Sequence, residues 1–248
     1  MKAIYIIWLR QVKRHARSRA RMIGALGQPL PFLFAMGFGF GPIYQKAQGA
    51  SYLQFLAPGI VAMPILFTAV FSGIELVWDK QFGFLKETLV APVPRLHIVL
   101  GRILGGATVA VVQGVIMLLV CVATGFRPSS GPSIAGAALM MFLIAVLFAG
   151  IGTAIASLVE DMQGFPLIMN FLVVPLFFFS NALFPMQGAP RLLRLVLSLN
   201  PVTYGIDGLR GSLDGSFRFD LGTDAAILGA LAACVVAFAS WLFSKIQI

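Results

Sequence analysis

The feature that most constrains this chain is a series of long apolar runs that contain few charges. Of the 248 residues, 59% are hydrophobic and only 11% are charged, whereas a soluble domain carries roughly 25% charged residues. A helix needs about 20 mainly apolar residues to cross the hydrocarbon core of a bilayer. The chain holds about six such runs with little between them. This pattern predicts one all-α polytopic membrane domain over residues 1–248.

The predicted elements follow one another along the whole chain. An amphipathic helix at 2–21 places five basic residues on one face and Trp8 on the other, which is typical of a helix lying in the membrane interface. Pro58 and Pro64 are the expected kinks of the second span. The six spans are predicted at 22–43, 53–77, 97–125, 133–158, 165–184 and 223–244.

The basic residues predict the orientation of the chain in the membrane. Twelve of the 18 lie in segments on the side of the N-terminus, and six lie on the other side. By the positive-inside rule, both termini are expected in the cytoplasm of a multi-pass protein of the cell (inner) membrane. Because the net charge of +9 is spread over short segments between apolar runs, the partners expected for it are lipid headgroups rather than nucleic acid.

Pairs of small residues four apart predict places where helices pack closely. The three pairs are Gly37 with Gly41, Gly101 with Gly105, and Gly150 with Ala154.

The segment between the second and third spans contains a short helical piece at 83–91. Gly83 precedes it and Pro92 ends it, and it carries both apolar and charged residues. Two interpretations stay open from periodicity alone. The piece docks into a groove of a partner protein, or it is an amphipathic connector that rests on the headgroups.

The segment at 187–213 holds two amphipathic pieces that are too short to span the bilayer. Asn200 is suited to cap the second piece and Pro201 to begin it. Asp207 and Arg210, three residues apart, are predicted to pair. The segment is interpreted as a re-entrant hairpin in the outer leaflet. The alternative is a lid that packs on the fifth and sixth spans.

Aromatic, methionine and amide side chains on the first, second and fifth spans are candidates to line a substrate pathway, because such surfaces adapt to varied apolar ligands. The alternative is that each of them packs against other helices or lipid. The candidates are Phe34, Phe38, Met63, Phe67, Phe71, Asn170, Val174, Phe177 and Asn181.

Four stretches together carry a resemblance to a known family. They are LAPGI at 56–60, the run from Glu75 to Arg95, PLFFFSNALFPM at 175–186 and LNPVTYGIDGLRG at 199–211. In their order and spacing the chain resembles the ABC-2 type permeases, close to the drug-resistance and nodulation-factor export branch with the type V exporter fold. Asn181 departs from the pattern, since family members often have glycine after the serine.

The resemblance implies an export function and a set of partners. Two permease subunits, expected as a homodimer, would face each other and bind two copies of a separate ATPase subunit. Alternating access would then move a drug, a lipid or a lipid-linked molecule outward, as in multidrug efflux. The piece at 83–91 would be the coupling helix, and Tyr204 would belong to the re-entrant hairpin with the residues named above. The expected coupling residues are Asp79, Gly83, Phe84, Leu85, Lys86, Glu87 and Leu89.

The residues themselves support a transport subunit rather than an enzyme. No G-x-x-x-x-G-K-[ST] loop occurs, so ATP and Mg²⁺ are expected on the partner, with no cofactor, metal or catalytic residue on this chain. An ATP-independent secondary carrier would need a carboxylate near the middle of a span, and none of the predicted spans has one there. A membrane-embedded lipid enzyme would need an acid–base or metal cluster, and His15 and His97 are the only histidines.

Overall fold

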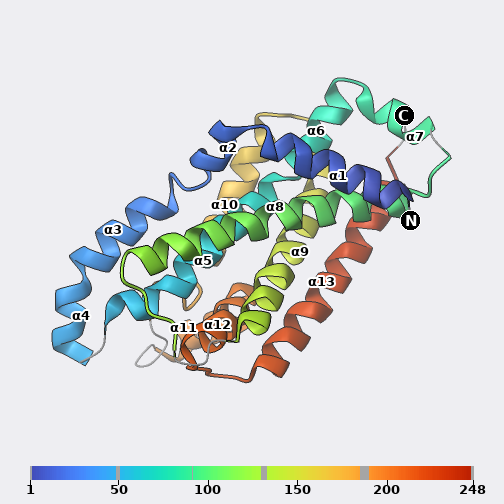
Figure 1. The fold of residues 1–248 in the computed structure, drawn as a ribbon. Helices are drawn as coiled ribbons and strands as arrows, with labels where there is room; N and C mark the ends of the chain where they lie inside the picture. The colour runs from blue at the N-terminus through green and yellow to red at the C-terminus, as the bar shows by residue number, and fades with distance from the viewer. Residues whose placement is uncertain (1, 49–50, 91, 130–132, 185–189, 247–248) are drawn as a thin grey trace.

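The protein was examined as a computed structural model that describes residues 2–48, 51–90, 92–129, 133–184 and 190–246. Within these ranges all regular secondary structure is helical (Figure 1). The thirteen helices of the described residues are α1 (Lys2–Ala16), α2 (Arg19–Gly24), α3 (Pro29–Gly39), α4 (Gly41–Gln48), α5 (Tyr52–Phe71), α6 (Ile74–Gln81), α7 (Phe84–Val90), α8 (Arg95–Ala123), α9 (Ile134–Leu158), α10 (Gly164–Phe178), α11 (Arg191–Leu199), α12 (Pro201–Asp214) and α13 (Leu221–Ser244).

Five segments of the described chain are long and apolar enough to cross a membrane. They are Met22–Gly39, Tyr52–Gln81, α8, α9 and α13. The predicted fifth span at 165–184 corresponds to α10, which is apolar but has only 15 residues. That length is short of the roughly 20 residues that a crossing requires.

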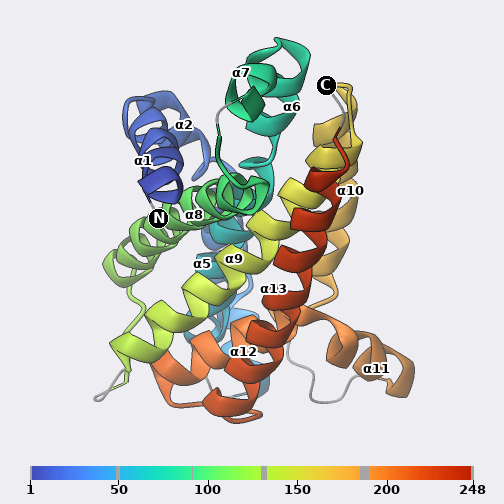
Figure 2. The same cartoon turned by 90° about the vertical axis from the view of Figure 1, so that its right-hand side faces the viewer.

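The helices define two ends of the molecule (Figures 1 and 2). One end carries α1, α7 and the last turn of α13, and we call it the basic end. The other end carries α4, α11 and α12, and we call it the far end. The long helices α5, α8, α9 and α13 connect the two ends and form most of the core.

The predicted first span at 22–43 is divided rather than continuous. α2 ends at Gly24, α3 begins at Pro29, and α4 begins at Gly41. Proline lacks a backbone N–H and is favoured at the first position of a helix, which explains why α3 starts there.

The predicted second span is also interrupted, at Ser72–Gly73 between α5 and α6. The two predicted kinks, Pro58 and Pro64, lie inside the uninterrupted α5. At the break the backbones of two helices touch, because a Cβ on Gly73 would clash with the Gly152 carbonyl and a Cβ on Gly152 would clash with that of Val70.

The predicted small-residue pairs differ in what they contact. Gly101 and Gly105 admit α1 onto α8, since added Cβ atoms would lie 2.8 Å from the Cβ atoms of Ile7 and Gln11. A Cβ added at Gly41 would meet no atom of another element within 4 Å. Gly150 lets α9 pack closely on α13, since an added Cβ would lie 2.9 Å from Cγ1 of Val235, and the backbone contact of α9 with α5 falls two residues later at Gly152.

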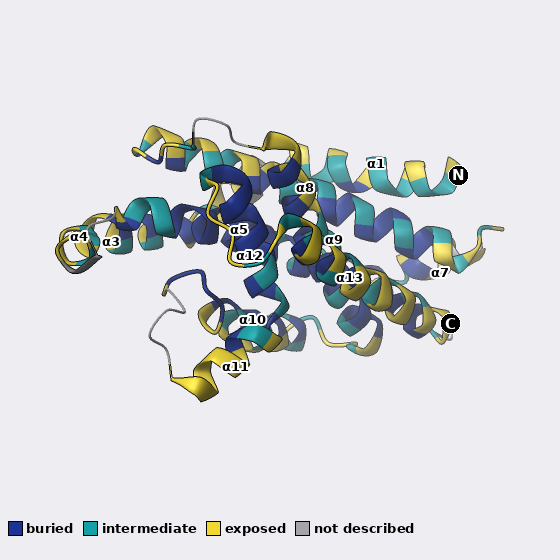
Figure 3. Ribbon diagram, turned by 90° about the horizontal axis from the view of Figure 1, so that it is seen from below, coloured by how far each residue is buried: buried dark blue, intermediate teal, exposed yellow. Residues whose placement is uncertain are grey.

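The two pieces of the predicted hairpin have different environments (Figure 3). Most residues of α12 are buried, and this helix packs on α5, α9 and α13. In contrast, α11 exposes almost all of its side chains and projects from the body (Figure 2). The start of the predicted segment, 187–189, lies outside the described residues.

Buried polar contacts join α12 to its neighbours. The Asn200 side chain accepts from Val202 N (3.0 Å) as the helix cap and donates to the carbonyls of Leu176 and Phe179 (2.6 Å each). Tyr204 donates to the Ser198 carbonyl (2.7 Å).

Asp207 and Arg210 make their hydrogen bonds to backbone groups instead of the predicted pair. Asp207 accepts from the N–H groups of Arg218 (3.0 Å) and Phe219 (2.9 Å). The Arg210 guanidinium donates to the carbonyls of Phe55 (3.2 Å) and Asn181 (2.9 Å) and lies over the Phe55 ring. Burial lowers the pKa of Arg210 to about 10, although nearby Asp207 opposes the shift.

Candidate functional site

The candidate site is built on the short helix α6 at the basic end. Its two acidic residues, Glu75 and Asp79, are four residues apart and therefore lie on one helical face. Both are buried. A carboxylate taken out of water is stable as an ion only when cations or hydrogen-bond donors surround it.

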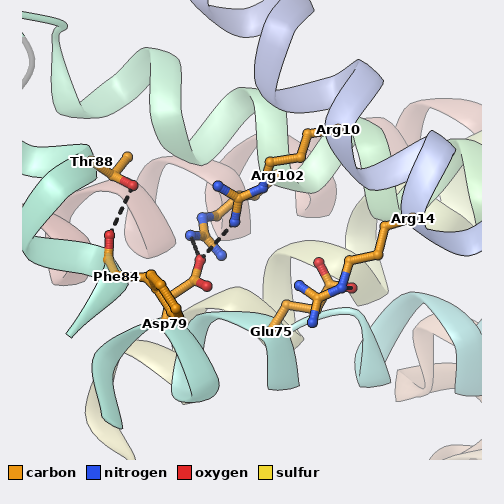
Figure 4. A network of polar contacts seen from close by, with 7 residues as sticks. All are labelled: Arg10, Arg14, Glu75, Asp79, Phe84, Thr88 and Arg102. Atoms are coloured by element: carbon orange, nitrogen blue, oxygen red, sulfur yellow. Dashed lines mark hydrogen bonds and ion pairs between the residues drawn. The ribbon is translucent and has the colours of Figure 1, made fainter. Parts of the chain in front are cut away.

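Asp79 obtains two cationic partners from different helices (Figure 4). Arg10 of α1 lies 3.1 Å from Asp79 Oδ2, and Arg102 of α8 donates to the same oxygen. Arg102 is only 6% exposed, so its charge depends on this carboxylate. Asp79 thus connects α6 with α1 and α8.

A further ion pair repeats the connection one turn earlier. Arg14 of α1 lies 3.6 Å from Glu75 and stacks over the Trp78 ring at 5.6 Å. Beyond it, the side chains of His15 and Gln113 are 3.2 Å apart and join α1 to α8 again. α1 is therefore bound to α6 and α8 by charged and polar contacts along its length.

Lys80 connects α6 to the end of α9. Its ammonium donates to the carbonyls of Ala156 (3.1 Å), Ser157 (3.1 Å) and Val159 (2.8 Å). These carbonyls belong to the C-terminal turn of α9 and its flank, which lack helical N–H partners and attract cations. Lys80 thus ties α6 to the C-terminal end of α9.

α7 follows α6 directly and is only partly packed against the molecule. Gly83 separates the two helices with a φ of +80°, a conformation that favours glycine. Leu85 is buried and anchors α7, whereas Phe84 is 56% exposed and Lys86 and Glu87 are exposed as well. Leu89 lies in α7, and its side chain is outside what the structure describes, as is residue 91.

A mainly apolar pocket of about 490 Å³ lies next to Glu75, between α1–α2 and α5, α6 and α8. Phe67 and Phe71, two of the predicted pathway residues, line it and stack on each other. Its polar lining includes Gln11, His15 and Glu75.

The other predicted pathway residues are divided between core and surface. Met63, Phe177 and Asn181 are buried within the chain, where they pack. Phe34 and Phe38 are exposed and stack on each other, and Asn170 is also exposed. Val174 is partly buried.

Sequence reasoning named Asp79 but missed the partners that make it a network. From the sequence alone, no contact is assigned to Arg102 or Lys80. One signal was available: Arg102 is a charge inside the long apolar run that became α8, and an arginine in such a run requires a partner.

Taken together, the apolar spans, the charged junction at one end and the absence of any strand from the described residues define a multi-pass helical membrane protein. The chain belongs to the ABC-2 type transporter family, whose model matches residues 2–213.

Relatives of the chain include nodulation proteins and putative transport permeases. It is 27% identical to Nodulation protein J of Sinorhizobium fredii over 210 residues, which cover 84% of this chain and 79% of that protein. It is 28% identical to Nodulation protein J of Bradyrhizobium diazoefficiens, covering 88% and 81%. It is 31% identical to the putative transport permease ycf38 of Pyropia yezoensis, covering 78% and 68%.

Proposed function

We propose that this chain is the permease subunit of an ATP-driven exporter, coupled to a separate ATPase subunit through α7. The observation that carries the proposal is the junction at α6. An exposed short helix with an aromatic and two charged side chains is joined, through α6, to α1, α8 and α9. A force applied to α7 would therefore reach three other helices rather than one.

The substrate proposed for this exporter is hydrophobic or amphipathic, such as a drug, a lipid or a lipid-linked molecule. The aromatic walls of the pocket at Phe67 and Phe71 suit an apolar group. Outward movement would follow from rocking of the helices when the partner subunits close on ATP.

We also propose that two copies of the chain assemble. Asn170 is an exposed amide on an otherwise apolar helix, beside exposed Leu167 and Phe171. An amide that faces lipid lacks hydrogen-bond partners, whereas one that faces a second copy can find them. The exposed pair Phe34 and Phe38 would belong to the same pathway surface.

The coupling proposal is tested by reconstituting the chain with its ATPase subunit in lipid. We expect the wild-type chain to bind that subunit and to raise its ATP hydrolysis. The double variant Phe84→Ala, Glu87→Gln should bind about tenfold more weakly, as is usual when an interface loses an aromatic anchor.

The matched control is Ile43→Ala, Lys46→Gln on α4, which changes an exposed apolar and an exposed charged side chain at the far end. It should leave the affinity and the stimulation intact. Unchanged binding and hydrolysis in the α7 variant would rule out coupling through this helix.

The assembly proposal is tested by disulfide trapping in a Cys121→Ala, Cys234→Ala background. Asn170→Cys should yield a cross-linked dimer on mild oxidation, and Leu231→Cys on the exposed side of α13 should not. Cross-linking from Leu231→Cys alone would place the contact between copies on the wrong face.

A further inference from the structure

A second cavity, distinct from the pocket at Phe67 and Phe71, lies at the basic end behind α7. Its volume is about 800 Å³. The ends of four elements enclose it, namely α6, α7, α9 and α13, and we call it the lysine pocket. Its charged lining residues are Lys80, Lys86, Lys245 and Glu160, and its leucines are Leu85, Leu158 and Leu242.

The cations of the lysine pocket have separate tasks. Lys80 is held by three carbonyls of the α9 terminus at 2.8–3.1 Å, and so it forms part of the wall. Lys86 and Lys245 make no ion pair with the residues that the structure describes. With Glu160 as the one acidic lining residue, the pocket is positively charged.

The wall formed by α13 is fixed in place. Arg95, at the start of α8, donates to the carbonyls of Ser244 (2.5 Å) and Ile246 (3.1 Å). These bonds hold the last turn of α13 beside α8. The pocket is therefore a built feature between secured helix ends and not a gap beside a loose terminus.

The surroundings of the pocket place it at the level of lipid headgroups. α13 exposes Leu231, Phe238 and Trp241, as a helix in contact with acyl chains does. The Lys245 ammonium lies 3.5 Å from the centre of the Trp241 ring. A tryptophan with a lysine at the end of an apolar helix is typical of the membrane–water interface.

We infer that the lysine pocket binds the headgroup of an anionic phospholipid from the adjacent leaflet. Lys86 and Lys245 contact the phosphate, and the three leucines contact the glycerol and first acyl carbons. Basic pockets between membrane helices suit such headgroups. A soluble anion would leave the leucines uncovered, and an acidic protein surface would not need them.

The site links two helices that otherwise belong to separate parts of the molecule. A lipid held by Lys86 of α7 and Lys245 at the end of α13 bridges the exposed short helix to a lipid-facing span. The inference does not rest on the proposed transport function, since it concerns only lipid binding by this chain.

The test measures retained lipid on the purified full-length chain by native mass spectrometry, with phosphatidylglycerol and phosphatidylcholine offered in equal amounts. The wild-type chain should prefer phosphatidylglycerol. Lys86→Gln, Lys245→Gln should lose that preference by about tenfold or more, because each lysine near an anionic surface contributes roughly a factor of five. Lys86→Arg, Lys245→Arg should restore it, which separates loss of charge from loss of fold.

The matched control removes two exposed lysines from α1, at the same end of the molecule, as Lys2→Gln, Lys13→Gln. It should keep the preference, and an equal loss in both double variants would overturn the site. If millimolar inorganic phosphate displaced phosphatidylglycerol, the pocket would be a site for a soluble anion and not for a phospholipid headgroup. Loss of ATPase binding with unchanged lipid retention in Lys86→Gln, Lys245→Gln would overturn it in favour of a protein contact.

Discussion

At the scale of single residues, Asp79 matters most because two arginines depend on one carboxylate. Arg102 is buried and cannot be solvated if Asp79 is neutral, whereas the Arg10 side chain is 52% exposed and reaches water. Replacing Asp79 should therefore destabilise the protein more than replacing Arg10.

We predict that Asp79→Asn lowers the free energy of unfolding by about 3–5 kcal/mol, because it leaves the Arg102 charge buried without a counter-ion. Arg10→Gln should cost only about 0–1 kcal/mol, as exposed ion pairs do. Denaturant unfolding in detergent measures both. Equal losses in the two variants would show that Arg102 does not depend on Asp79.

Asn200 is a second residue whose side chain has several structural tasks. It caps α12 and also holds the end of α10 through two carbonyls. Asn200→Asp keeps the capping oxygen but replaces the donor with an oxygen that faces those carbonyls.

We predict that Asn200→Ala costs about 1–3 kcal/mol of unfolding free energy, from the lost cap and the unpaired carbonyls. Asn200→Asp should be at least as damaging although capping is retained, because a carboxylate oxygen then faces the carbonyl oxygens of Leu176 and Phe179 without a hydrogen between them. Thermal unfolding distinguishes the cases. A wild-type midpoint for Asn200→Asp would mean that the cap alone is important.

At the scale of elements, the close packing of α1 on α8 depends on two glycines. Gly101 and Gly105 leave room for Ile7 and Gln11, and Trp8 donates to Thr108 (2.9 Å) alongside them. Only with this close approach can Arg10 and Arg14 reach the carboxylates of α6. The ion pairs between α1 and α6 therefore depend on the close packing of α1 on α8.

We predict that Gly101→Val displaces α1 and lowers stability by about 1–3 kcal/mol, as overpacking does. Gly229→Val is the matched control, because Gly229 has open space around it on α13. The displacement should also make Trp8 more accessible to an aqueous fluorescence quencher, measured in a variant whose other tryptophans are replaced by phenylalanine. If Gly101→Val matched Gly229→Val in both stability and accessibility of Trp8 to the quencher, the close packing of α1 on α8 would be contradicted.

At the scale of the whole molecule, the two ends differ in charge and should differ in the compartment that they face. α7 lies at the basic end, and the loop with Ser216 follows α12 at the far end. The excess of basic residues at the first end favours its retention in the cytoplasm.

We predict that Ser216→Cys reacts with an impermeant maleimide in intact cells and that Lys86→Cys reacts only after permeabilisation. Both are placed in the Cys121→Ala, Cys234→Ala background, since Cys234 is exposed. Labelling intensity on a gel gives the result. The reverse pattern would invert the orientation and move α7 away from any cytoplasmic ATPase.

Much of the arrangement follows from the sequence alone. Apolar runs of about 20 residues must lie in a bilayer, which predicted the helical class and the positions of α8, α9 and α13 closely. Signals for helix ends and turns were equally informative, because they depend on residues that are close in the sequence. Asn200 caps α12 and Pro201 begins it, and Gly83 precedes a short helix, because capping and backbone preferences act within a few residues.

Only the tertiary structure decided which side chains meet. Arg102 and Asp79 are 23 residues apart, and Arg10 and Asp79 are 69 apart, so no periodic pattern could pair them. The break at Gly73 depends on Gly152 of another helix. Apolar runs show that helices cross a membrane because lipid excludes charge, and they say little about contacts, since every apolar face is equally compatible with lipid. Side-chain packing and the pairing of buried charges determine which of those faces contact each other. The junction of α6 with α1, α8 and α9 is therefore visible only in the folded chain.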